Sequence, residues 1–376
     1  MKAEFPPLKE VRKDLKIDWY RSPIVRARLV ELAARSDLHG LLQAGGHLAL
    51  FACTGVLSYY FFEQGMWIAF ALALFAHGTV GCFFAGIATH ELGHATVFKT
   101  PWLNRLFLNI FSILSWWNHR EYSLSHTYHH RYTLHPQGDR EVLLPKAPSL
   151  KPLFLLQLFT FNVFGGFEAR GFLPFVKGTI LMALGRHDSN ERGQWNADAI
   201  ADQPEVKRKA VNFARLILLF HAAVLAVAIV FELWLLPVLL TLFSFIGGWL
   251  RHFVGAPMHM GLRSNVPDFR LCVRTITLDP ISEFLYWRMN WHIEHHMFAA
   301  VPYYNLAKLH KEVASDMPET RTLVGAWREM RETWRKQQDY PDYEHVTPLP
   351  SLSEDRSIEA GPLATSIGDI APASFK

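Results

Sequence analysis

The sequence predicts an all-α integral membrane fold, with two transmembrane helical hairpins (four spans) and a cytoplasmic helical cap. Three observations predict it. Half of the 376 residues are hydrophobic, including 28 Phe and 12 Trp, and only 19% are charged. This balance suits a membrane protein better than a soluble domain. Long charge-free runs occur in pairs, and the basic residues gather outside them.

The first pair of runs predicts the first hairpin. Residues Leu38 to Phe62 are free of charge, Glu63 interrupts, and Gln64 to Thr89 are again free of charge. A helix needs about 20 apolar residues to cross the hydrocarbon core of a bilayer. Each run is therefore long enough to span it, and only a short turn separates the two. A pair of buried core helices is the alternative.

The second hairpin is predicted from Leu216 to Phe231 and from Leu233 to Leu250, with Arg215 able to snorkel at its start. Two further apolar stretches, Leu106 to Trp117 and Pro152 to Phe167, are too short or too polar to span comfortably. We interpret them as interfacial or partly inserted helices.

Basic residues predict the orientation. Nine Lys and Arg side chains lie in the first 40 positions, whereas the turns near Glu63 and Glu232 carry none. The positive-inside rule therefore puts both termini in the cytoplasm. The net charge of +4 implies no nucleic acid, because the basic residues flank membrane segments. The long polar N-terminus does not look like a cleavable signal peptide.

The rest of the chain divides by composition. Four parts are expected: 1–37, a cytoplasmic N-terminal segment; 38–310, the membrane domain; 311–339, a cytoplasmic amphipathic helix; and 340–376, a disordered tail. The amphipathic helical pattern itself runs from Asn305 to Gln338, and Arg186 to Lys209 is a polar cytoplasmic excursion. The three cysteines form no CxxC pair, so they support neither a disulfide framework nor a thiolate metal site.

Three histidine clusters carry the chemistry. They read HxxxH at 90–94 and HxxHH at 126–130 and 292–296. With 19 histidines in the chain, chance gives about one HxxxH but only roughly 0.05 copies of HxxHH. Residues three and four apart share a helix face, so each cluster aims its imidazoles at one point. Eight ligands suit a pair of transition metals, and imidazole accepts iron, zinc, copper or nickel. These eight are His90, His94, His126, His129, His130, His292, His295 and His296.

The predicted topology brings the clusters to one side of the membrane. The second span ends at His90, the second cluster lies between the hairpins, and the third follows the last span, which ends near Arg251. A shared metal centre, carried by the cap, requires this arrangement. The alternative is that each cluster is merely interfacial or solvated. His252 and His259, just past the fourth span, are candidates for a ninth ligand, and both could approach the metals if the helix continued, although Pro257 argues against that.

With these motifs, the chain resembles the integral-membrane fatty acid desaturases. The resemblance rests on the three boxes in this order between two hydrophobic hairpins, and on the run from Asn290 to Phe298 with its sequel up to His310. It covers Leu38 to His310. Ala299 stands where many relatives have proline, and His292 stands where front-end members have glutamine. The His-Pro-Gly-Gly signature of a fused haem domain is missing from the sequence.

The resemblance implies a centre of two non-haem Fe ions that uses O2 to remove hydrogens from an unactivated C–H bond. The expected enzyme is an O2-dependent fatty acyl (lipid) desaturase that introduces a C=C bond. Electrons would come from an external donor, a ferredoxin or small cytochrome with its reductase. The lipid or acyl substrate would enter a tunnel lined by aromatic residues of the hairpins and of the 106–117 helix. The ligands would be the eight box histidines and a ninth, for which His259 is favoured over His252.

Four carboxylates near the boxes could orient the imidazoles, although each could equally be an ordinary solvated acid: Glu91, Glu294, Asp139 and Glu141. Three other functions are alternatives to a desaturase. A membrane di-iron hydroxylase shares the same boxes. An intramembrane metalloprotease would use His90–His94 as HExxH, but the Asp-Gly motif that supplies its third ligand does not occur. A metal transporter would need clustered intramembrane ligands, and His47, His77 and His221 form no cluster.

Overall fold

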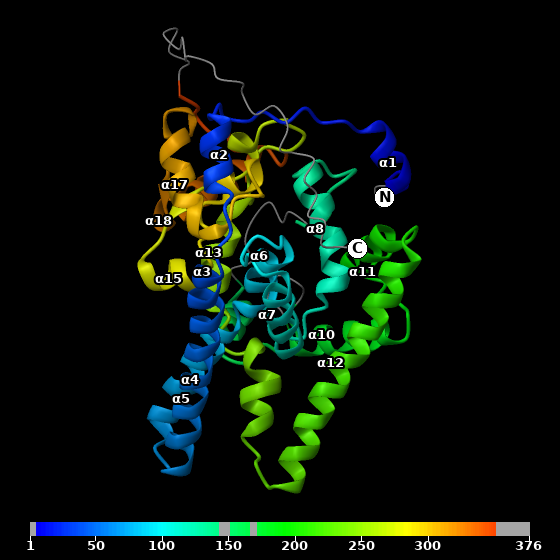
Figure 1. The fold of residues 1–376 in the computed structure, drawn as a ribbon, viewed down its shortest axis with the longest axis vertical. Coiled ribbons are helices and arrows are strands. Elements are labelled where there is room, and N and C mark those ends of the chain that lie inside the picture. Colours follow the sequence, from blue (N-terminus) through cyan, green and yellow to red (C-terminus); the bar gives the residue numbers. More distant parts are fainter. Residues whose placement is uncertain (1–4, 143–150, 166–170, 351–376) are drawn as a thin grey trace.

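The computed structural model describes residues 5–142, 151–165 and 171–350, and these are mostly helical. Figure 1 shows an elongated molecule in which α4, α5 and α12 extend toward one end and α6, α8 and α17 gather near the other. The first half contains α1 Leu8–Asp14, α2 Arg26–Leu32, α3 Asp37–Gly40, η1 Leu41–Gly45, α4 Gly46–Glu63, α5 Trp67–Gly81, η2 Phe84–Ala88, α6 Thr89–Gly93, α7 Pro101–Leu114, α8 His119–Tyr132, α9 Pro152–Phe159 and α10 Phe172–Ala183.

The second half contains α11 Glu191–Ile200, α12 Pro204–Val230, η3 Val238–Leu242, η4 Phe243–Phe245, α13 Trp249–Gly255, η5 Ala256–Met258, α14 Phe269–Cys272, β1 Ile276–Thr277, α15 Pro280–Leu285, α16 His292–Met297, α17 Tyr303–Val313, η6 Ala314–Asp316, β2 Arg321–Thr322 and α18 Leu323–Asp339. The strands β1 and β2 form a two-stranded parallel sheet.

The first predicted hairpin is present. Among the described residues, three helical stretches are long and apolar enough to cross a membrane: Asp37–Glu63, Trp67–Gly93 and Pro204–Val230. The first two correspond to the two charge-free runs, and only residues 64–66 separate them. In Figure 1, α4 and α5 lie side by side as a projecting pair. The prediction of a helical protein with apolar spans is therefore correct for this part.

The second hairpin differs from its prediction. Its first arm, α12, begins at Pro204, earlier than expected: proline stands at its first position, and Glu205 in the first turn pairs with Arg208. Its second arm is not one continuous helix. Helical structure covers η3 and η4, and the chain then becomes extended at Ile246, where it bridges to Phe161. Gly247 has a φ of 62°, which breaks the helix before α13 begins.

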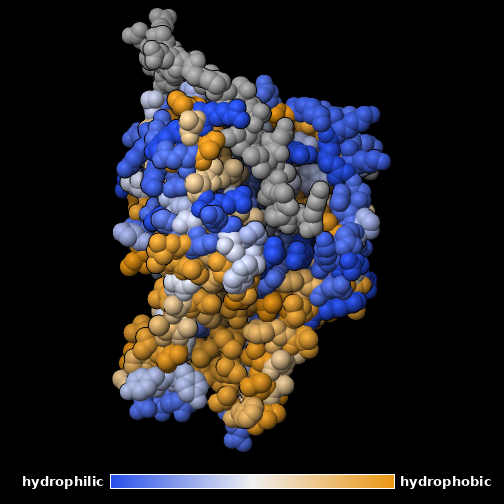
Figure 2. Space-filling view, in the orientation of Figure 1, coloured by the Kyte–Doolittle hydropathy of each residue, from blue (hydrophilic) through white to orange (hydrophobic). Residues whose placement is uncertain are grey.

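The surface matches this arrangement. In Figure 2 the lower part of the molecule, formed by the projecting helices, is mostly hydrophobic except at its lowest ends, and the upper part is mainly hydrophilic. Ile68, Leu219 and Val230 are 81%, 67% and 72% exposed. Such large apolar side chains cost free energy in water but not in lipid. Together with the three apolar helices, this identifies a membrane protein.

Several other predicted helices are present with different boundaries. The 106–117 helix is α7 Pro101–Leu114, and α9 ends at Phe159; residues 166 and 167 of the 152–167 stretch lie outside the described residues. The amphipathic pattern after residue 305 forms two helices, α17 and α18, because the chain breaks around Pro318 and restarts at Thr322, whose side chain caps Gly325 N. Of the expected disordered tail, residues 340–350 are described and 351–376 lie outside the described residues.

The three intramembrane histidines join neighbouring helices. His77 Nε2 donates to the carbonyl of Leu239 (2.9 Å), and His221 Nε2 donates to that of Ile113 (3.1 Å). His47 accepts a hydrogen bond from Trp287 Nε1 (2.9 Å). Each ring is therefore a polar contact that links a membrane helix to another part of the fold.

Candidate metal centre

A kink in the second membrane helix positions the first histidine box. After α5 the chain leaves helical geometry at Ala85 (ψ 127°) and Gly86 (φ 72°). Gly86 adopts this left-handed conformation without strain because it lacks a Cβ. The helix then restarts as α6, which carries His90, and His94 caps its C-terminal end. The kink thus turns the first box out of the axis of the membrane helix.

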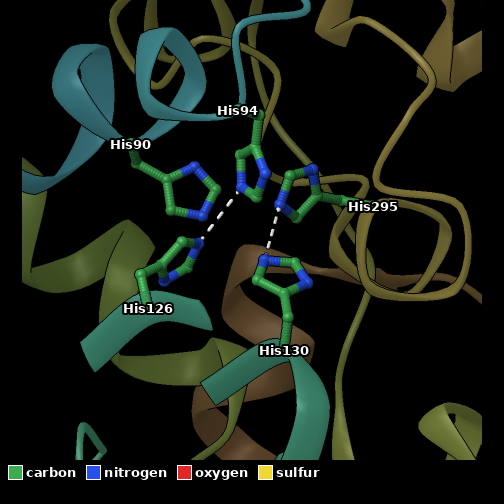
Figure 3. A group of neighbouring side chains, drawn as sticks. All are labelled: His90, His94, His126, His130 and His295. Atoms are coloured by element: carbon green, nitrogen blue, oxygen red, sulfur yellow. Dashed lines mark hydrogen bonds between the residues drawn. The ribbon is translucent and has the colours of Figure 1, made fainter. Parts of the chain in front are cut away.

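The second and third boxes lie on two other short helices. Asn118 caps α8 by accepting from Glu121 N, and α8 contains the whole of 126–130. All of 292–296 lies on α16, which is buried throughout. His259 follows the single turn η5 and is 6% exposed. Segments more than 150 residues apart in sequence therefore meet at one place (Figure 3).

The histidines form two groups. The first consists of His90, His94, His126, His130 and His295, and the second of His129, His259 and His296. Within each group, one ring nitrogen from each histidine lies within 4.8 Å of those from the others. Figure 3 shows the five rings of the first group pointing toward one another. His292 joins the second group, because its Nε2 lies 3.1 Å from His259 Nε2 and its ring centroid lies 4.6 Å from that of His296. All nine predicted site residues are thus brought together.

The expectation that each cluster aims its imidazoles at one point is wrong for the two HxxHH boxes, whose histidines divide between the groups. The HxxHH spacing explains the division. Successive residues on an α-helix are about 100° apart, whereas residues four apart lie nearly above one another. His126 and His130 accordingly point into the first group, and His129 points into the second. The third box repeats the pattern with the groups exchanged: His295 belongs to the first group, and His292 and His296 face the second.

The spacing of the nitrogens fits metal ligation. Nε2 atoms face each other at 3.1 Å (His94 and His126), 3.2 Å (His130 and His295) and 3.1 Å (His259 and His292). Two imidazole nitrogens bound to one ion at about 2.1 Å and at right angles lie about 3.0 Å apart. Among the described residues, no hydrogen-bond partner is found for the buried Nε2 of His90 or of His296. Each group could therefore hold a metal ion.

Three of the four predicted acids orient these rings. His90 Nδ1 lies 3.0 Å from Glu91, His126 Nδ1 3.0 Å from Glu141 and His129 Nδ1 2.9 Å from Asp139. A proton held on Nδ1 leaves the Nε2 lone pair free to bind a metal. Glu294 is different. It accepts from Thr275 Oγ1 (2.6 Å) and lies 2.5 Å from His310 Nδ1, so it links α16 to α17.

Sequence reasoning missed three further groups beside these rings. The Tyr122 hydroxyl lies 3.1 Å from His126 Nδ1. His259 Nδ1 donates to the backbone carbonyl of Cys272 (3.1 Å). Thr133 Oγ1 donates its proton to the carbonyl of His129. Toward His296 it therefore acts as the acceptor, and His296 Nδ1 donates to it at 3.2 Å. A backbone carbonyl carries no signal in the sequence. Thr133 lies one turn after its partner His129, and that spacing is the only signal that could have found it.

Burial keeps most of these imidazoles neutral. It lowers the pKa of His94 to about 4 and that of His259 to about 3, and it holds the pKa of His126, His130 and the three histidines of the third box well below 6.5. Burial also lowers the pKa of His129, but the Asp139 carboxylate outweighs it and the pKa is raised. Neutral imidazole is the form that binds metals.

His252, the other candidate for the ninth ligand, does not reach the centre. Its ring contacts Phe154 at 5.1 Å and Trp327 at 6.1 Å between centroids. The helical argument that would have brought both residues close to the metals fails because α13 ends at Gly255 and η5 has a different pitch.

These features define a class: a helical membrane protein with two adjoining histidine groups suited to metal ions. The family model for fatty acid desaturases matches residues 65–327, well over half of the chain. The chain belongs to the fatty acid desaturase family, and it is an oxidoreductase of the type that this family contains. A comparison with curated proteins gave no match. The family match leaves out α4 and ends within α18.

Proposed function

We propose that the protein is an O2-dependent di-iron desaturase that introduces a C=C bond into a fatty acyl (lipid) chain. The observation that carries this proposal is the division of nine histidines into two adjoining groups within a family of desaturases. His90, His94, His126, His130 and His295 would hold one iron, and His129, His259, His292 and His296 the other. When bound, two irons supply the O2 activation that an unactivated C–H bond requires.

The protein's own contribution is to hold the ligands and to keep water away. Glu91, Glu141 and Asp139 fix the protons on Nδ1 of three rings, so their Nε2 atoms stay available. The hydrophobic side chains within the boxes, Leu92 and Ile293, are buried. A dry site of this kind protects reactive species from side reactions with water.

A long apolar substrate fits the surroundings of the site. A cluster of buried aromatic rings connects the membrane helices to the segment before the first box: Phe84 lies 4.8 Å from Phe51 and 4.5 Å from Phe111, and Phe111 lies 5.9 Å from Trp287. The α7 helix that carries Phe111 overlaps the stretch expected from the sequence to line a tunnel. We propose that the acyl chain reaches the histidines along this cluster.

The electrons are proposed to come from a separate protein, a ferredoxin or small cytochrome with its reductase. Removing two hydrogens from the chain provides two of the four electrons that convert O2 into two waters, so two more must be supplied. A stack of aromatic rings that reaches a box histidine supports an entry point for these electrons. Half-buried Trp19 stacks on buried Phe269 (centroids 4.0 Å apart), and Phe269 lies 5.5 Å from the ring of His296.

We further propose four membrane passes with both termini and the active site in the cytoplasm. The nine basic residues of the first 40 positions support this orientation by the positive-inside rule. The interrupted helical stretch after α12 would be the fourth pass, because it runs back from the lower end of the molecule beside α12 (Figure 1). A basic cytoplasmic face also suits an acidic electron donor.

Lipid analysis tests the proposed reaction. Membrane lipids from cells that express the protein are compared with those from cells that express the His295→Ala variant. A desaturase produces acyl chains that are two hydrogens lighter than the substrate. A gain of one oxygen would show a hydroxylase instead. An unchanged lipid profile together with consumption of a small polar compound would contradict the acyl substrate.

A further inference from the structure

His259 is held differently from the other eight histidines. Those eight lie on α6, α8 and α16 or at the end of α6, where helical hydrogen bonds fix the backbone. His259 follows the 3-10 turn η5, and its backbone (φ −128°, ψ −18°) is neither helical nor extended. A ligand on such a segment needs support from elsewhere in the fold, because no regular helix determines its position.

Arg274 supplies this support. Its Nη1 donates to the carbonyls of Pro257 (2.7 Å) and Met260 (2.6 Å), which lie on either side of His259 in the chain. Its backbone N–H donates to the carbonyl of Met258 (2.8 Å). One residue thus holds three carbonyls around His259. Arg274 is 2% exposed, so water competes little with these bonds.

The buried guanidinium is neutralised by the C-terminal helix. Arg274 Nε donates to Glu329 Oε1 (2.6 Å), and Glu329 lies on α18. The other carboxylate oxygen of Glu329, Oε2, accepts from Arg321 Nε (3.1 Å) and lies 3.1 Å from His345 Nε2. A buried cation without such a partner is strongly destabilising. The position of Arg274 therefore depends on Glu329.

The segment after α18 completes the enclosure. The backbone N–H of His345 donates to the carbonyl of Gly261 (2.8 Å). Gly261 has a φ of 74°, and a Cβ at that position would lie 3.1 Å from Thr333 of α18. Trp327 Nε1 donates to the carbonyl of Phe253 (2.9 Å). The loop that carries His259 is thus covered from Phe253 to Gly261 by residues 327–345, most of which lie beyond the family match.

We propose that Arg274 and Glu329 are positioning residues for His259, and that the C-terminal segment 327–345 controls metal occupancy of one group only. The affected group is the one formed by His129, His259, His292 and His296. Within the described residues, the Arg274 side chain donates to carbonyls beside His259 and to none beside the five other histidines. This inference rests on the proposed function, because it assumes that both groups hold iron.

The test measures iron per chain in purified, iron-reconstituted protein carrying Glu329→Gln, which keeps the shape of the side chain but removes its charge. Glu332→Gln is the matched control, because Glu332 is an exposed glutamate on the same helix. The His259→Ala variant gives the reference iron content and spectrum for the loss of one ion. Mössbauer spectra of 57Fe-loaded samples identify which iron remains, and thermal unfolding of the iron-free proteins detects a general loss of stability.

We expect wild type and Glu332→Gln to hold two irons. Glu329→Gln should lose half of its iron, and the Mössbauer spectrum of the remaining iron should match that of His259→Ala. His345→Ala, a milder change, should hold both ions but release one of them faster to a chelator. Full iron in Glu329→Gln, or parallel loss of both ions, would overturn the clamp while the proposed function stands. A wild type that takes up no iron would overturn both.

Discussion

His129 and His130 are neighbours in the chain, yet their imidazoles belong to different histidine groups. The ring of His129 lies 4.9 Å from that of His259, and the ring of His130 lies 4.9 Å from that of His295. The turn of α8 between successive residues separates them. We therefore expect His129→Ala and His130→Ala each to abolish turnover but to weaken different ions.

Mössbauer spectra of the two variants check this expectation, with membrane insertion as the control for folding. The residual iron signals should differ between His129→Ala and His130→Ala. Identical residual spectra would mean that the two histidines serve one ion.

Alanine variants also show which of His259 and His252 is the ninth ligand. His259 is buried against His129 and His292, whereas His252 contacts Phe154 and Trp327. We expect His259→Ala to lose about half of its iron and nearly all activity, and His252→Ala to keep both. Metal analysis and turnover assays on the two variants decide it; the reverse pattern would make His252 the ninth ligand.

Asp139 should matter through His129. Its carboxylate lies 2.9 Å from His129 Nδ1 and raises the pKa of that histidine against the effect of burial. Replacing such an orienting carboxylate typically costs 10- to 100-fold in metal affinity. We expect a loss of about this size in Asp139→Asn, measured by competition with a chelator. Asp14→Asn, at an exposed position on α1, serves as the control and should leave the affinity unchanged.

Trp19 should influence electron delivery. It is the outer ring of the stack that reaches His296 through Phe269. We expect Trp19→Leu to slow reduction of the iron centre by a protein donor severalfold, while reduction by dithionite and the iron content stay as in wild type. Trp102→Leu, a change at an exposed position on α7, is the control. Equal rates for Trp19→Leu and wild type with the protein donor would place the entry point elsewhere.

The first hairpin and the convergence of the eight box histidines could be predicted from the sequence, for physical reasons. Absence of charge over Leu38 to Phe62 indicates a membrane helix directly, and the HxxHH spacing brings three imidazoles per box to the centre, although it divides them between two groups. The same absence of charge does not reveal the break at Ile246–Gly247, because hydropathy is insensitive to backbone direction.

Other parts of the site could not be predicted from local patterns. The clamp of Arg274 on the carbonyls around His259 involves backbone atoms, and its partner Glu329 is distant in sequence. The two-residue strands β1 and β2 are too short to show an alternation of side chains. Pro318 and Thr322 are residue types that often interrupt or begin a helix, but the amphipathic pattern continues across them and favours one helix.

The central claim is that nine histidines hold two irons, five around one ion and four around the other. Its most direct test is 57Fe Mössbauer spectroscopy of purified wild-type protein combined with quantitative metal analysis. We expect two irons per chain in two inequivalent environments, and activity that is lost on chelation and restored by iron. A single ion per chain, or zinc alone with iron unable to restore activity, would contradict this account.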